Sequence, residues 1–193
     1  MSWKLLFGSE FLIGDKSVLV YQTKSRTQKE VQFVLRVARY RPDILLEWES
    51  LSHQGTIHLH RSAVQTAKIF HLHSFFEIGI DVESDNAMTG WLSADMYKEL
   101  TEKESFKMKL NRMPVKMTLV NKGVFTLTVD KQVVEVPVIY VEDDRQGLWT
   151  FHENPENPIL MAYRSIHFDQ YLETISNSPD NKLRWIQHLA PIK

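Results

Sequence analysis

Alternating apolar and polar residues run through the first sixty positions of the chain. Residues 30–40 (EVQFVLRVARY) place an apolar side chain at every second position. Residues 17–24, 44–52 and 56–60 repeat this period of two, which is typical of half-buried strands. Short polar turns, such as residues 53–55 (HQG), separate these segments. We therefore expect an antiparallel meander, because parallel neighbours would need longer crossovers.

Helical spacing replaces this alternation in two places. Ser62 precedes a short apolar-periodic stretch and predicts a helix over 62–70 with Ser62 as its N-cap. Ser93 precedes ADMYKELTEK and predicts a second helix over 94–103. Residues 181–189 (NKLRWIQHL) form a third, short amphipathic candidate.

The period of two returns after residue 105. Expected strands cover 106–110, 115–120, 124–130, 132–143, 148–153, 159–165 and 171–176, with turns at NRMP, NKG and DK. No repeat or linker divides the chain. We predict an all-β fold with minor helices, built as a single β-rich domain over residues 1–193. Its form is a curved antiparallel sheet or incomplete β-barrel with two or three short helices.

Composition narrows the possible functions. The 193 residues are 43% hydrophobic and 24% charged, with a formal net charge of -1, so no basic excess favours nucleic acid. The absence of cysteine excludes disulfides, thiol nucleophiles and Cys-ligated metals. No apolar stretch is long enough for a membrane span, and Gly8, Glu10 and Asp15 interrupt any signal-like segment. We expect a cytoplasmic protein, with envelope association as the alternative.

Two His-x-His pairs are the most conspicuous chemistry in the chain. His58 and His60 would share one face of a strand, which suits two ligands of one metal ion. The second pair, His71 and His73, would lie at a helix end and point apart. The sequence does not indicate which acid would converge as a third ligand, although Asp81, Glu83 and Asp85 are candidates. We therefore expect no metal and no cofactor, with His58 and His60 as the residues that would bind a metal if one is present.

Other catalytic motifs are missing or incomplete. Residues 81–92 place acids at Asp81, Glu83 and Asp85, but Asn86 and Leu92 stand where an EF-hand needs Gly and Glu. There is no G-x-S-x-G, P-loop or G-x-G-x-x-G. The acidic pair at 143–144 is typical of a turn. Whether the protein is an enzyme stays open, with a His-ligated, metal-dependent hydrolase as one alternative.

Large apolar side chains supply the remaining hypothesis. A curved sheet rich in aromatic residues and methionine can enclose an apolar or acyl ligand, and ordinary core packing uses the same residues. The candidate cavity-lining residues are Phe33, Trp48, Trp91, Met108, Met117, Phe125, Trp149 and Met161. We expect the two helices to cover this face.

The C-terminal third resembles a known group. It has strand 136–141, a tight turn, strand 148–151 and an Asn157-Pro158 pair opening strand 159–163, with Pro137 and Gly147 as further anchors. This pattern resembles the closing hairpins of lipoprotein-carrier-like half-barrels of the LolA and LppX type and related uncharacterised bacterial envelope proteins. The resemblance implies a curved antiparallel sheet around a helix with an apolar cavity. The chain departs from that group because it lacks a visible export signal and a lipidated cysteine.

Two functional hypotheses follow. The first is a non-enzymatic binding protein that holds an apolar small molecule inside the sheet. The second is an interaction module of an assembly, which would use a strand edge or the loop 80–92 as its docking surface. The sequence does not separate them, and it leaves the oligomeric state open.

Overall fold

The computed structural model describes residues 13–25, 30–51, 53–72, 76 and 81–177. Of these described residues, 62% are strand and 11% are helix, so the all-β class with minor helices is confirmed. The strands are β1 (Val18–Ser25), β2 (Val31–Tyr40), β3 (Ile44–Ser50), β4 (His53–Leu59), β5 (Ile69–Phe70), β6 (Val82–Ser84), β7 (Ala87–Met88), β8 (Ser105–Leu110), β9 (Met113–Val129), β10 (Gln132–Asp143), β11 (Leu148–His152), β12 (Leu160–Arg164) and β13 (Phe168–Ser176). The helices are α1 (Arg61–Thr66) and α2 (Ala94–Lys103). The predicted helix at 181–189 lies outside the described residues.

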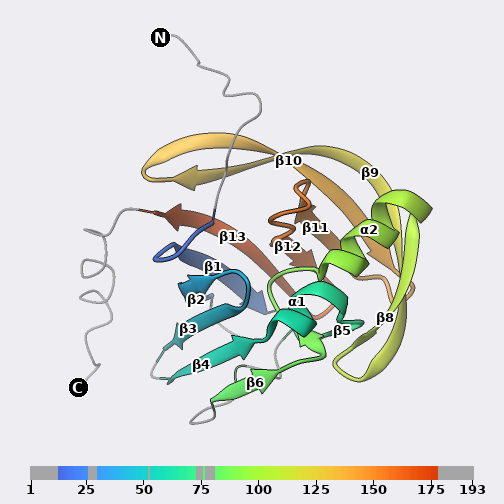
Figure 1. The fold of residues 1–193 in the computed structure, drawn as a ribbon. Coiled ribbons are helices and arrows are strands. Elements are labelled where there is room, and N and C mark those ends of the chain that lie inside the picture. The colour runs from blue at the N-terminus through green and yellow to red at the C-terminus, as the bar shows by residue number, and fades with distance from the viewer. Residues whose placement is uncertain (1–12, 26–29, 52, 73–75, 77–80, 178–193) are drawn as a thin grey trace.

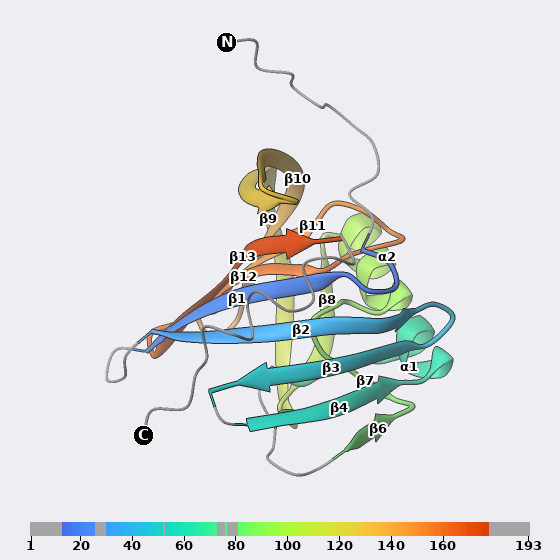
Figure 2. The ribbon, with the colours of Figure 1, turned by 90° about the vertical axis from the view of Figure 1, so that its left-hand side faces the viewer.

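The first four strands form the predicted antiparallel meander. β1 pairs with β2, β2 with β3 and β3 with β4, and Figure 2 shows them side by side in one layer. The predicted turn at 53–55 is wrong, because the chain turns between Ser50 and His53 and Gly55 lies inside β4 opposite Trp48. The Trp48 indole covers Gly55 so closely that a Cβ there would lie 2.6 Å from Nε1 of Trp48. Glycine therefore serves packing at this position and does not mark a turn.

β9 and β10 form a long curved hairpin that arches over the other strands (Figure 1). The expected break at NKG is wrong, since β9 continues through it for 17 residues. Gly123 leaves room for the ring of Tyr140, which would approach a Cβ at that position to 2.7 Å. The register shifts between Tyr140 and Val141, and such a bulge bends the hairpin.

All thirteen described strands belong to one curved sheet, in the order β6-β4-β3-β2-β1-β13-β12-β11-β10-β9-β8-β5-β7. A short parallel contact between β13 and β9 closes β9 to β13 into a partial ring. The sheet is mixed instead of antiparallel throughout, since β4 with β6 and β5 with β7 and β8 are also parallel pairs. The connections through the helical region are long enough to permit this return. β6 and β7 stand at opposite ends of the order yet follow each other in sequence, so the sheet curves back toward its own start.

The helix α2 is confirmed at its predicted bounds. The Oγ of Ser93 accepts a hydrogen bond from the Met96 amide at 3.1 Å, and Asp95 lies in the first turn. The side chains of Met96, Tyr97 and Leu100 are buried. Ser93 also donates to the carbonyl of Ala67 at 2.8 Å, so the cap joins α2 to the end of α1.

The helix α1 is shorter than predicted and begins differently. It ends at Thr66, and Ile69 and Phe70 form β5 because β7 and β8 offer them backbone partners. The predicted N-cap, Ser62, lies inside the helix. His60 occupies the N-cap position, and its side chain makes no capping hydrogen bond. The His60 side chain is therefore available for other contacts.

Candidate functional site

The hairpin of β3 and β4 brings three potential metal ligands together at one end. Asp43 immediately precedes β3, and His60 immediately follows β4. The pairing of Ile44 with Leu59 and of Leu45 with His58 places Asp43 beside His60. Leu59 is buried, so His58 and His60 project from the opposite face of the strand. This confirms the prediction that the two histidines share a face.

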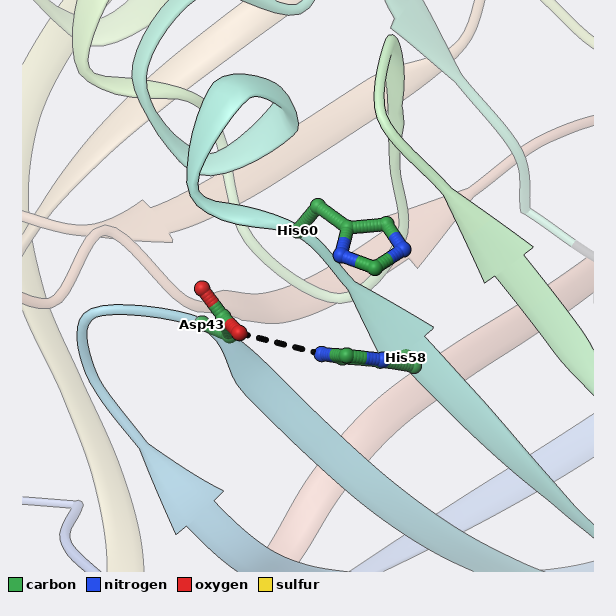
Figure 3. Close-up of side chains that lie close together, drawn as sticks. All are labelled: Asp43, His58 and His60. Atoms are coloured by element: carbon green, nitrogen blue, oxygen red, sulfur yellow. Dashed lines mark hydrogen bonds and ion pairs between the residues drawn. The ribbon is translucent and has the colours of Figure 1, made fainter.

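The ligand atoms of Asp43, His58 and His60 all lie within 4.8 Å of one another. The closest approach joins Nε2 of His58 to Oδ2 of Asp43 at 3.1 Å. The two imidazole rings have centroids 4.1 Å apart. Figure 3 shows one nitrogen of the His60 ring turned toward Asp43 and His58, while the other is turned away. These three residues are therefore close enough to share one small ion.

Arg39 of β2 contacts the same two atoms. Its Nη2 lies 3.3 Å from Oδ2 of Asp43 and 3.2 Å from Nε2 of His58. Nε2 of His58 carries either a proton, which it donates to Asp43, or a lone pair, which accepts from Arg39. It serves one of these neighbours at a time. Arg39 and Asp43 therefore compete for Nε2 of His58, and only one of the two hydrogen bonds can form in a given tautomer.

Further groups fix the orientation of the ligands. The Arg61 amide donates to Oδ1 of Asp43 at 3.1 Å, which leaves Oδ2 directed at His58. The amide of His60 donates to the Ser84 carbonyl at 2.8 Å. Nε2 of His60 lies 3.7 Å from a carboxylate oxygen of Glu83. A carboxylate behind a ligating imidazole is a common outer contact of metal sites.

The electrostatics of the site favour a charged carboxylate. The hydrogen bond from His58 lowers the pKa of Asp43, and the charge of Arg39 acts in the same direction. The side chains are partly exposed, with 25% for Asp43, 23% for His58 and 39% for His60. An ionised carboxylate and imidazoles within reach of solvent can exchange water for a metal ion.

The donor set suits a divalent transition metal, and the spacing of His58 and Asp43 matches that of two ligands on one ion. Two imidazoles with one carboxylate are typical of zinc and of other first-row metals. Two ligands bound at about 2.1 Å to one tetrahedral or octahedral ion lie about 2.9–3.4 Å apart, which includes the 3.1 Å between His58 and Asp43. Three protein ligands would leave at least one coordination position to water.

The second His-x-His pair does not join this cluster. Among the described residues that could hold a metal, Asp43, His58 and His60 form a group and His71 is not part of it. His71 follows β5 instead of ending a helix, and its partner His73 lies outside the described residues. Burial lowers the pKa of His71, and the nearby charge of Arg112 acts in the same direction.

The acids considered from the sequence as a third ligand, Asp81, Glu83 and Asp85, do not belong to the group of Asp43, His58 and His60. Asp81 accepts a hydrogen bond from Thr56, and Glu83 reaches His60. The ligand that sequence reasoning missed is Asp43, which stands fifteen positions before His58. The signal that could have found it is the hairpin register. The register that pairs residue 50 with 53 also places residue 43 beside 60.

The eight predicted cavity-lining residues lie in the protein core. Seven of them are buried. Phe125 is partly buried and packs against the core. The rings of Trp149 and Phe151 are stacked with centroids 6.0 Å apart, while Phe33 stacks on Trp48 at the same centroid separation. A lining role for these residues stays a prediction. A separate apolar pocket of about 260 Å³ is lined by residues that include Val18, Val20 and Ile175.

The carboxylate of Asp143 performs the predicted turn role. It accepts hydrogen bonds from the amides of Arg145 and Gly147 and from Nε1 of Trp149, at 2.8 to 2.9 Å. These bonds close the connection from β10 to β11, so the Asp143 carboxylate stabilises the fold.

Comparison with known protein families, with curated proteins and with solved structures gave no match for this chain. Of the features that the resemblance to lipoprotein-carrier-like half-barrels implied, the structure shows a large curved sheet, which is mixed and has a partial ring of strands, and no family is identified. None of the helices in the described part of the chain has the length and apolar composition that crossing a bilayer requires.

Proposed function

We propose that the protein binds a divalent transition metal ion, with zinc as the leading candidate, through Asp43, His58 and His60. The observation that carries the proposal is the convergence of one carboxylate and two imidazoles within 4.8 Å at the end of one hairpin. The sequence-based objection to a metal was that no acid was seen to converge. Asp43, at 3.1 Å from His58, removes that objection.

The surroundings of the ligands support the proposal further. The Arg61 amide and Glu83 hold groups of the cluster from outside, as outer contacts of metal sites do. The strands β3 and β4 pair over seven residue pairs, and the ligands lie on them or directly at their ends, so a rigid element positions the site. Three ligands with an open position also occur in catalytic zinc sites, and hydrolysis by a metal-bound water remains the enzymatic alternative.

Isothermal titration of the metal-free protein with Zn²⁺ tests the proposal. We expect one equivalent to bind, and the double variant His58→Gln, His60→Gln to lose that binding. The matched control is His53→Gln, which removes a histidine from the same strand outside the cluster. The unloaded double variant should keep its stability within about 0.5 kcal/mol, because both imidazoles are partly exposed.

Two results would contradict the proposal. If the wild-type protein binds no equivalent of zinc in the titration, the proposed site is rejected. Equal zinc binding by wild type and the double variant would place the metal elsewhere. Elemental analysis of protein purified without chelator provides the independent measurement.

A second candidate function is the binding of a small apolar group. It is favoured by the pocket of about 260 Å³ between β1, β13 and the β9–β10 turn. That volume lies below the roughly 300–1,000 Å³ of typical ligand pockets, so it suits the end of an acyl chain better than a whole lipid. Native mass spectrometry of the purified protein tests it, and Val20→Trp should abolish any adduct by filling the pocket.

A further inference from the structure

We infer that the metal-loaded site takes an oxyanion, a carboxylate or phosphate group, which the metal and Arg39 hold together. This inference rests on the proposed metal function and adds the class of ligand that the site would receive. It concerns the coordination position that Asp43, His58 and His60 leave open.

The contacts of Arg39 provide the first argument. Its Nη2 contacts Oδ2 of Asp43 at 3.3 Å and Nε2 of His58 at 3.2 Å. Both atoms are ligand atoms of the proposed site. A metal ion would take the lone pair of Nε2 of His58 and would share the carboxylate of Asp43 with Arg39. Within the described part of the chain, these are the side-chain partners of Arg39. Loading therefore removes the His58 contact of the guanidinium, weakens its contact with Asp43, and leaves its other N–H donors beside the metal for a bound anion.

The balance of charge provides the second argument. Among the described residues, two carboxylates lie at the site. Asp43 is itself a ligand, and Glu83 contacts His60. A divalent ion together with Arg39 exceeds the negative charge of these two groups. A bound oxyanion neutralises the excess, and a guanidinium binds a carboxylate or phosphate through two parallel hydrogen bonds.

Access to solvent provides the third argument. The Arg39 side chain is 45% exposed, and the histidines lie on the outer face of the meander. A ligand can therefore reach the metal and the guanidinium from solvent. The chain as a whole has a formal charge of -1, so the attraction for anions is local to this cluster.

Titration of the Co²⁺-loaded protein tests the inference, because the visible spectrum of Co²⁺ reports its ligands. Acetate and inorganic phosphate are added in separate arms, which distinguish a carboxylate from a phosphate site. We expect a saturable spectral change in at least one arm. Arg39→Met should weaken that anion affinity by roughly tenfold or more, and Arg39→Lys should restore only part of it.

Arg36→Met is the matched control, since it removes the same charge from the same strand beside Glu49. It should leave anion affinity unchanged. A Co²⁺ spectrum that neither anion alters would overturn the inference while the metal function stands. Failure to bind Co²⁺ or Zn²⁺ would reject both proposals. Equal anion affinity in wild type and Arg39→Met would exclude Arg39 as the anchor.

Discussion

The guanidinium of Arg39 lies against the carboxylate of Asp43, with Nη2 of Arg39 3.3 Å from Oδ2. This arginine therefore supplies a positive charge that balances the carboxylate of a proposed metal ligand. A metal ion that binds Asp43 and His58 must displace Arg39 or bind beside it. Metal binding is therefore expected to weaken the contact between Arg39 and Asp43.

Replacing Arg39 by methionine should strengthen metal binding. A divalent ion and a guanidinium about 4 Å apart repel each other by about 2 kcal/mol even in a water-like dielectric, so zinc affinity should rise by roughly tenfold or more. Calorimetric titration at low ionic strength measures the change. The same variant should bind anions more weakly, as argued above, and a general loss of structure would not move the two affinities in opposite directions.

Arg36→Met serves again as the control, because Arg36 pairs with Glu49 at 3.3 Å away from the cluster. Its zinc affinity should stay near that of wild type. Weaker zinc binding in Arg39→Met would mean that the arginine supports the ligands instead of competing with the ion.

Most of the sheet and the two histidines of the site could be predicted from the sequence, but the third ligand, Asp43, could not. The period of two identifies strands because alternate side chains face the core. The position of Asp43 depends on hairpin register, and Gly55 misled that assignment by looking like a turn residue. Its role is to make room for Trp48, a contact that only the paired strands create. Likewise, Ile69 and Phe70 become a strand because β7 and β8 are there to pair with them.

The packing of Trp48 on Gly55 predicts a strong effect of a single methyl group. In Gly55→Ala, the new Cβ would lie 2.6 Å from Nε1 and 2.9 Å from Cε2 of Trp48. Overpacking of this kind costs about 1–3 kcal/mol, and chemical denaturation should show the loss. Gly14→Ala is the matched control, since a Cβ there meets no atom within 4 Å. Adding Trp48→Leu to Gly55→Ala should recover part of the lost unfolding free energy, because the smaller side chain leaves room for the methyl group. If the losses of the two single variants simply add in the double variant, the two residues are not in contact.

The two serines that resemble N-caps should behave differently. Ser93 accepts from the Met96 amide and donates to the Ala67 carbonyl, so Ser93→Ala should cost about 1–2 kcal/mol of unfolding free energy. Ser62→Ala should change the unfolding free energy by less than about 0.5 kcal/mol, because Ser62 is exposed and does not cap α1. Thermal unfolding of both variants measures the difference, and equal losses would reject the assignment of the cap.

Burial of His152 predicts that stability depends on pH. Burial lowers the pKa of this imidazole below its ordinary value, although the hydrogen bond between its Nδ1 and the Asn157 carbonyl, at 3.1 Å, acts in the opposite direction. Above about pH 6.5 the group is neutral in both states, and its contribution is fully present. Below that pH the unfolded chain gains a proton that the folded protein does not. The unfolding free energy should therefore fall as the pH drops from about 6.5 to the lower folded pKa.

Urea unfolding with chelator present, at several pH values between about 7 and 5, measures this dependence. The slope contributed by one group cannot exceed about 1.4 kcal/mol per pH unit. His152→Asn should lower stability at pH 7 and flatten the slope. The pKa of His71 is also lowered by burial, so His71→Asn should flatten it too, and the double variant should be flatter than either. An unchanged slope in His152→Asn would mean that the imidazole is protonated equally in the folded and unfolded chain, which its burial against Asn157 argues against.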